Sequence, residues 1–206
     1  MVRKLVAKCQ RWLAGFSYRR HADRQPPRPI TWVVGPEEVA SMVASISTAI
    51  PSSFSVSLSK HPFYFERYDY NGSPESKRWP LRMLEEAWMF GKLAAWAQGF
   101  IYVGPGGFLR GQSDSREFEF DFLKQRGVGI CCFFTGSDIR SIPVMAEMEK
   151  RLGLPNIASY LPALSPVFSS ESYDLARKQL AATADRYADV IFNAAVDQAG
   201  YLTKET

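Results

Sequence analysis

Short apolar runs alternate with longer segments of helical periodicity from Pro29 onward, and this alternation constrains the fold more than any other feature of the chain. The runs that have the composition of strands cover residues 30–34, 53–58, 100–103, 128–134 and 189–194. The segments between them are long enough to hold crossover helices, and such connections place successive strands parallel. The sequence therefore predicts an α/β fold.

The expected architecture is a Rossmann-like, mostly parallel sheet of five strands, or slightly more, with helices on both faces. The run VGICCFF at 128–134 is the most uniformly apolar and predicts a central strand buried on both sides. A helix is expected to start at Pro36, with Glu37 and Glu38 in its first turn. Another is expected to begin near Pro80.

Three further helices are expected in the second half. Asp114 and Glu117 form a possible capping box for one that ends at Gly127. The next has Pro143 near its start, and the last carries an apolar stripe between Tyr173 and Tyr187. The stretch YDYNGSPES and the proline-punctuated stretch after the Pro143 helix are both predicted as loops.

The first 28 residues form a segment of their own, and residues 29–206 form the Rossmann-like domain. Apolar side chains recur at helical spacing along this segment: Val2, Leu5, Val6, Cys9, Trp12, Leu13 and Phe16. Eight basic side chains stand against one acidic residue, Asp23, a net charge of +7 in a chain whose overall charge is +4. Two interpretations stay open: the helix lies on an anionic membrane, or it docks on the domain or on a partner protein. The stretch HADRQPPRP after it is a proline-rich tether.

Composition argues against several classes of protein. Three cysteines, of which Cys131 and Cys132 are adjacent in an apolar run, make no disulfide framework and have no metal-ligand spacing. The two histidines, His21 and His61, do not indicate a metal site. No apolar run is long enough to span a bilayer. The basic charge belongs to the N-terminal segment, so a nucleic-acid partner is not expected. We expect a cytoplasmic protein, with possible attachment at the inner face of the membrane.

Ligands of open parallel sheets gather beyond the carboxyl ends of the strands. The segments that meet there are Gly35-Pro36, the stretch around His61, Gly104 to Gly107, Thr135 to Arg140, and the residues from Asn193 onward. In the turn GPGG, Gly104, Gly106 and Gly107 would let a phosphate or sugar approach the backbone closely. The turn lacks the GxGxxG spacing of dinucleotide folds and the ending of a P-loop, so a plain tight turn is the alternative.

The string TGSDIR, which follows the most buried run, holds the candidate site. Asp138 is the candidate general base for an acceptor hydroxyl, and Arg140 is the candidate anion holder. Thr135, Gly136 and Ser137 complete the turn. The alternative is structural, with Asp138 or Ser141 capping the next helix and with Asp138 and Arg140 pairing with each other.

The combination REFEFDFLKQRGVGICCFFTGSDIR, followed by ADRYADVIFNA, resembles the N-terminal domain of GT-B glycosyltransferases of the family 4 type. The resemblance covers roughly residues 30–200. It implies that this domain binds the acceptor, a glycan or a lipid-linked molecule. It also implies that a second domain binds the nucleotide sugar. Thr135 stands where relatives often have histidine, which weakens an acid–base role for this turn.

The resemblance implies that the chain supplies the acceptor-binding half of a sugar-transferring enzyme. The donor domain would be a missing domain or a partner chain, so no cofactor is expected on this chain alone. Two alternatives remain: a non-catalytic interaction module, which could include self-association, and a small enzyme that binds a nucleotide near GPGG.

Overall fold

A computed structural model of the chain describes residues 2–59, 67–72, 78–136, 138–193 and 199–203. Six strands form one sheet in the order β3-β2-β1-β4-β5-β6, and every neighbouring pair is parallel. Their bounds are β1 Trp32–Pro36, β2 Phe54–Ser57, β3 Tyr70–Asn71, β4 Gly99–Val103, β5 Gly129–Phe133 and β6 Val190–Phe192. The prediction of a Rossmann-like α/β fold is confirmed.

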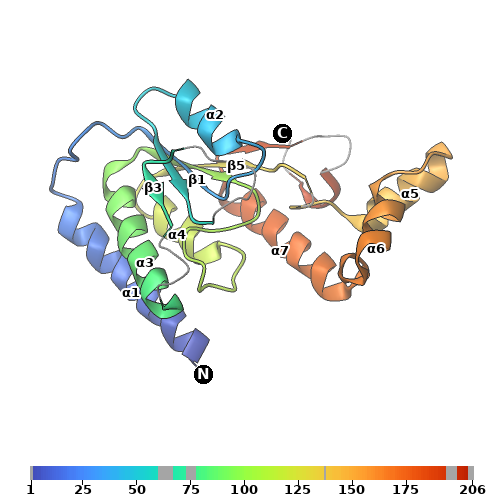
Figure 1. Cartoon of the computed structure of the whole chain (residues 1–206), viewed down its shortest axis with the longest axis horizontal. Coiled ribbons are helices and arrows are strands. Elements are labelled where there is room, and N and C mark those ends of the chain that lie inside the picture. The colour runs from blue at the N-terminus through green and yellow to red at the C-terminus, as the bar shows by residue number, and fades with distance from the viewer. Residues whose placement is uncertain (1, 60–66, 73–77, 137, 194–198, 204–206) are drawn as a thin grey trace.

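Helices lie on both sides of the sheet, but unequally (Figure 1). On one side lies α2; on the other lie α1, α3, α4 and α7, while α5 and α6 extend away from the sheet. The bounds are α1 Val2–His21, α2 Met42–Ala49, α3 Trp79–Trp96, α4 Glu117–Lys124, α5 Ile142–Leu152, α6 Ile157–Leu164 and α7 Glu171–Tyr187. Two short 3-10 helices, η1 Pro166–Ser169 and η2 Ala199–Tyr201, complete the described elements.

The core is divided by the sheet into a large and a small cluster. The large cluster packs β1, β4 and β5 against α3, α4 and α7, and its aromatic centre includes Phe90, Phe100, Phe108 and Tyr102. The small cluster lies under α2 and joins Val43 to alternate residues of β1, β4 and β5. Alternation of side chains along each strand explains how a single apolar run serves both clusters.

Three local predictions were wrong. The stretch predicted as the loop YDYNGSPES contains β3, a two-residue edge strand that pairs with β2 through Val56 and Tyr70. Pro36 ends β1 rather than starting a helix, and α2 begins only at Met42. The proline-punctuated stretch predicted as a loop after α5 holds α6 and η1.

The start of α2 follows from the side chain of Glu38. Its two carboxylate oxygens accept the backbone N–H groups of Val43 and Ala44, both at 3.2 Å. Those are donors of the first helical turn, which have no partner inside the helix. The carboxylate therefore caps α2 from outside, and Tyr68 donates its hydroxyl to the same group at 2.7 Å.

Helix α1 packs along α3 (Figure 1). Its buried face is narrow and mostly polar or small: Val6, Gln10, Ala14, Ser17 and His21. Gln10 donates to the carbonyl of Met83 at 2.9 Å, and Ser17 donates to that of Trp88 at 2.7 Å. Within the described residues, no helix is long and apolar enough to cross a membrane.

Candidate functional site

The strand order creates a topological switch point between β1 and β4. The chain leaves β1 toward β2 on one side, and leaves β4 toward β5 on the other, so the loops after these strands diverge. In open parallel sheets this divergence opens the crevice where ligands bind. The loop after β1 carries Glu37, and the loop after β4 carries the turn from Gly104 to Gly107.

The two turns singled out in the sequence lie side by side. The N–H of Gly104, at the end of β4, donates to the carbonyl of Phe133, at the end of β5, at 3.0 Å. Gly104 has a φ of +75°, a conformation that suits glycine. Gly104 and Asp138 are therefore at the same edge of the sheet, as the parallel arrangement predicts.

Asp138 is buried and holds its own turn closed. One of its oxygens, Oδ2, accepts the backbone N–H of Thr135 at 2.7 Å and the Thr135 hydroxyl at 3.2 Å. Of the two candidate caps, Ser141 is the residue that caps α5, by accepting the N–H of Val144 at 3.2 Å. Gly136 and Arg140 lie half-buried in the same segment. Ser137 lies outside the described residues, as does His61.

Glu37 lies against the glycine turn after β4, and sequence reasoning missed its role there. Its carboxylate accepts the N–H of Gly106 at 3.1 Å, and a Cβ on Gly106 would lie only 2.5 Å from the Glu37 carboxyl carbon. Burial raises the pKa of Glu37 above its ordinary value of 4.5; the bond from Gly106 opposes this shift, and the charge of Asp138 adds to it. The negative charge of Asp138, which follows β5, thus acts on the carboxyl group of Glu37, which follows β1.

A second carboxylate, Glu119 of α4, occupies the inner side of the β4 turn. It accepts the N–H groups of Phe108 and Leu109 at 2.9 and 2.8 Å, and the hydroxyl of Tyr102 at 2.9 Å. Burial raises the pKa of Glu119 to about 7, against the effect of these hydrogen bonds. A Cβ on Gly107 would lie 2.3 Å from its Oε1 atom. The glycines of this turn therefore accommodate the protein's own carboxylates, and three nearby backbone donors are already used.

Arg116 lies behind the same turn with spare hydrogen-bonding capacity. It is 4% exposed, adopts a φ of +71°, and stacks on the rings of Tyr102, Phe120 and Phe134 at 5.1 to 5.7 Å. Its Nη1 atom donates to the Gly104 carbonyl at 3.2 Å. Its Nε and Nη2 atoms are buried and have no hydrogen-bond partner within the part of the chain that the structure describes.

Asn193 also has buried polar atoms without a described partner, and it follows β6, two strands from β4 in the sheet. It follows β6 directly, and both its amide oxygen and its amide nitrogen are buried without a hydrogen bond to any described residue. Buried polar atoms without partners are rare in folded proteins, and each such group has a cost. The carboxyl edge of the sheet therefore combines two carboxyl groups with buried donors and acceptors that no described residue uses.

This arrangement suits a ligand that carries several hydroxyl groups. A carboxyl with a raised pKa can accept a hydrogen bond or a proton from a hydroxyl, and amide and guanidinium groups can bind the remaining oxygens. No group of three or more metal-ligating side chains occurs among the described residues. Comparison with protein-family models, with curated proteins and with solved structures found no match.

Proposed function

We propose that this chain binds a hydroxyl-bearing acceptor at the carboxyl edge of its sheet, as the acceptor-side half of a sugar-transferring enzyme. The nucleotide sugar would be bound by a second domain or a partner chain. The observation that carries the proposal is the position of two carboxyl groups at this edge: Glu37 accepts a hydrogen bond from Gly106 in the turn after β4, and Asp138 accepts one from Thr135 in its own turn.

The two carboxyl groups have different roles in this proposal. Glu37 is the proton acceptor, because its raised pKa brings it nearer to neutral pH than an ordinary glutamate. Asp138 positions the acceptor, because one of its oxygens is already committed to Thr135. The general-base role that the sequence suggested for Asp138 is thus proposed for Glu37 instead.

Acceptor binding can be tested by amide NMR with methyl glycosides of glucose, mannose and galactose as probes. We expect saturable shifts of the amides of Gly104, Gly106 and Gly136, and their loss in Glu37→Gln and Asp138→Asn. Glu147→Gln, on the exposed surface of α5, is the matched control and should bind as the wild type does. Folded variants that bind unchanged, or shifts confined to other amides, would contradict the proposal.

An interaction module is the second candidate, because one apolar strip of the sheet has no covering helix among the described elements. Val190 and Phe192 of β6 are 47% and 53% exposed on the α2 side, and Phe192 packs on Phe133 at 5.8 Å. Exposed apolar strips of this kind mark contact surfaces. If this strip pairs two copies, sedimentation should show a dimer that Phe192→Ser dissociates; a monomer at all concentrations would argue against self-association.

We also propose that α1 brings the acceptor-binding chain to the inner face of a membrane. The outer face of α1 exposes Leu5 at 62% and Trp12 at 64%, and Trp12 stacks on Phe16 at 5.4 Å. Lys4 and Lys8 are exposed on the same helix. Apolar side chains flanked by cations favour an anionic bilayer surface.

Vesicles of phosphatidylglycerol and phosphatidylcholine provide the test. Leu5→Glu or Trp12→Glu should abolish co-sedimentation, whereas Val167→Glu, at another exposed apolar position on η1, should leave it unchanged. Equal binding by all variants would remove the membrane part and leave the acceptor site unaffected.

A further inference from the structure

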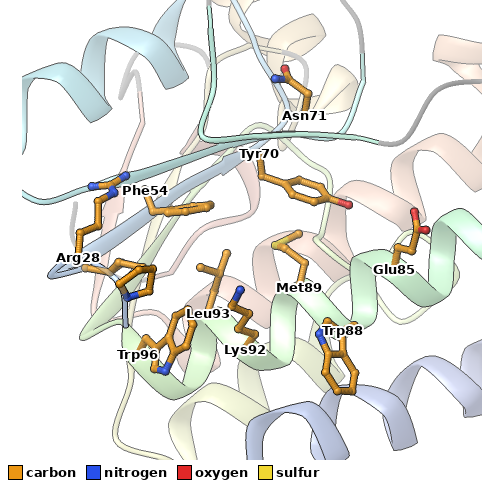
Figure 2. Close-up of a pocket in the computed structure, with 12 residues that line it drawn as sticks. Arg28, Phe54, Tyr70, Asn71, Glu85, Trp88, Met89, Lys92, Leu93 and Trp96 are labelled. Carbon is orange, nitrogen blue, oxygen red and sulfur yellow. The ribbon is translucent and has the colours of Figure 1, made fainter. Parts of the chain in front are cut away.

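A pocket lies away from the carboxyl edge, between α3 and the strands β2 and β3. Its volume is about 650 Å³, and Figure 2 shows Phe54 and Tyr70 from the sheet facing Met89 and Leu93 of the helix. The sheet contributes Phe54 and Tyr70, and α3 contributes Trp88, Met89, Leu93 and Trp96. This size and this largely aromatic and aliphatic lining are typical of small-molecule sites.

The pocket exists because α3 covers only part of the sheet on this side. Phe54 lies on β2 and Tyr70 on the edge strand β3, and both pack only partly against the core. Helix α1 lies against α3. No described helix follows β2 on this face, so the side chains of the edge strands line an open cavity.

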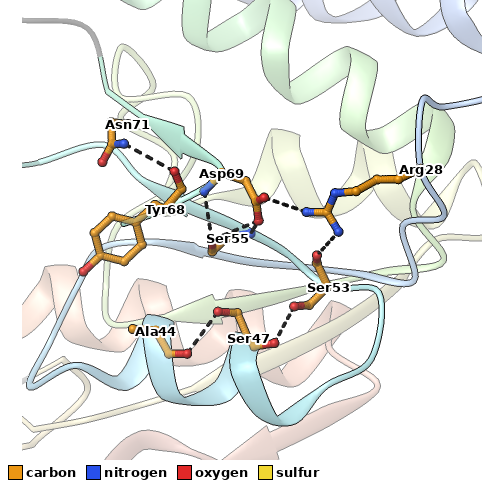
Figure 3. Close-up of polar contacts among 8 residues, drawn as sticks. All are labelled: Arg28, Ala44, Ser47, Ser53, Ser55, Tyr68, Asp69 and Asn71. Carbon is orange, nitrogen blue, oxygen red and sulfur yellow. Dashed lines mark hydrogen bonds and ion pairs between the residues drawn. The ribbon is translucent and has the colours of Figure 1, made fainter. Parts of the chain in front are cut away.

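One wall of the pocket is held in place by a polar network (Figure 3). Arg28 donates to Asp69 at 2.7 Å and to the Ser53 carbonyl at 2.8 Å, and its guanidinium lies 5.5 Å from the Phe54 ring. Asp69 in turn accepts the N–H of Ser55 on β2 at 2.8 Å. The charge of Arg28 is therefore paired, and its side chain serves as a fixed wall.

Lys92 leaves a positive charge at the same site. Its Nζ atom lies 4.8 Å from the Trp96 ring centroid, and it forms no ion pair with a carboxylate of the described residues. The third charged lining residue beside Arg28 and Lys92 is Glu85, which comes from the far end of the α3 segment, toward Tyr70 (Figure 2). The pocket thus has an apolar interior and a cationic group at its Trp96 end.

We propose that this pocket binds an amphiphile with a single hydrocarbon chain and an anionic head group. The chain lies among Phe54, Tyr70, Met89 and Leu93, and the head group pairs with Lys92. Burial of each methylene group is favourable, and the Lys92 ammonium, which forms no ion pair with a described carboxylate, selects the negative head. This proposal does not depend on the acceptor site, because no lining residue of the pocket belongs to that site.

The probes are dodecanoate and its ω-bromo derivative, both used below their micelle concentrations. Bromine quenches tryptophan fluorescence on contact, so Trp88 and Trp96 should report saturable binding of the brominated chain. Dodecanol and dodecyltrimethylammonium, measured by calorimetry, test the head group and should bind more weakly than dodecanoate.

Two substitutions locate the site. Met89→Trp fills the cavity and should weaken dodecanoate binding by about tenfold or more, with a melting curve to confirm that the variant is folded. Lys92→Gln should weaken it roughly fivefold, the scale of a partly exposed ion pair. Lys150→Gln, on the exposed surface of α5, is the matched control and should bind as the wild type does.

Each other outcome overturns the proposal. Quenching that does not saturate excludes a defined pocket, and a folded Met89→Trp protein with unchanged affinity places the ligand elsewhere. Dodecanol or dodecyltrimethylammonium binding as tightly as dodecanoate excludes an anionic head group. Equal effects of Lys92→Gln and Lys150→Gln would show only a general loss of positive charge.

Discussion

Replacing Glu119 with glutamine should make the protein less sensitive to pH. Burial raises the pKa of this carboxyl from 4.5 to about 7 in the folded protein. The folded state therefore binds a proton more tightly than the unfolded state does. The contribution of the protonated Glu119 carboxyl to stability is complete below about pH 4.5 and is lost as the pH rises through about 7.

The size of the effect follows from the shift in pKa. One pKa unit corresponds to about 1.4 kcal/mol, so the shift from 4.5 to about 7 corresponds to about 3 kcal/mol between the two ends of this range. The amide that replaces the carboxyl in Glu119→Gln cannot ionise, and that part of the pH dependence disappears. Burial also raises the pKa values of Glu37 and Glu86, but both residues are present in both proteins and their effects cancel.

Urea unfolding followed by circular dichroism, at about pH 5 and about pH 8, measures the difference. The wild type should lose about 2.5 kcal/mol more unfolding free energy between these pH values than Glu119→Gln does, because the rest of the difference falls below pH 5. Glu147→Gln, an exposed carboxyl on α5, should behave as the wild type. Equal losses in the wild type and in Glu119→Gln would refute the raised pKa and the account of the β4 turn that depends on it.

Two further predictions concern packing and reactivity. Gly91→Ala should destabilise the protein by about 2 kcal/mol in urea unfolding, because its Cβ would lie 2.2 Å from a backbone oxygen of α1. Gly15→Ala, whose Cβ would meet only an arginine side chain at 3.6 Å, should be neutral or stabilising by up to about 1 kcal/mol, and equal losses would contradict this reasoning. A maleimide should label one thiol of the native protein rapidly, that of exposed Cys9, because Cys131 and Cys132 are buried and burial raises the pKa of Cys131 to about 12. Rapid labelling of two or three thiols would show that the sheet is more open than described.

The parallel sheet could be predicted because its signal is local. Each apolar run and each helical period is contained in a few consecutive residues, and right-handed crossovers then leave few topologies. Strand β3 escaped prediction because Tyr70 and Asn71 are only two residues beside strong turn signals. The backbone of β2 pairs with Tyr70 and Asn71 and makes them a strand, although the sequence of β3 alone does not indicate one.

The residues of the candidate site could be predicted only in part. Asp138 and the glycine turns follow apolar runs directly, so their place at the sheet edge could be inferred. Glu37 resembled a helix-start residue because it follows proline, whereas its role depends on a contact with Gly106, 69 positions away. Arg116 and Glu119 lie in a stretch of alternating charged and aromatic residues, and only the tertiary fold shows that both are buried.

The packing of α1 has a practical consequence for anyone who shortens the chain. Trimming at Pro29 would strip the carbonyls of Met83 and Trp88 of their donors and leave the indole N–H of Trp96 without its acceptor, the His21 carbonyl at 3.2 Å. The surface exposed by the trimming would include Gly91, which the backbone of α1 at Ala14 approaches closely in the full chain. Such a shortened protein would tend to self-associate. That association would use the newly exposed face of α3 and would not represent a contact of the full chain.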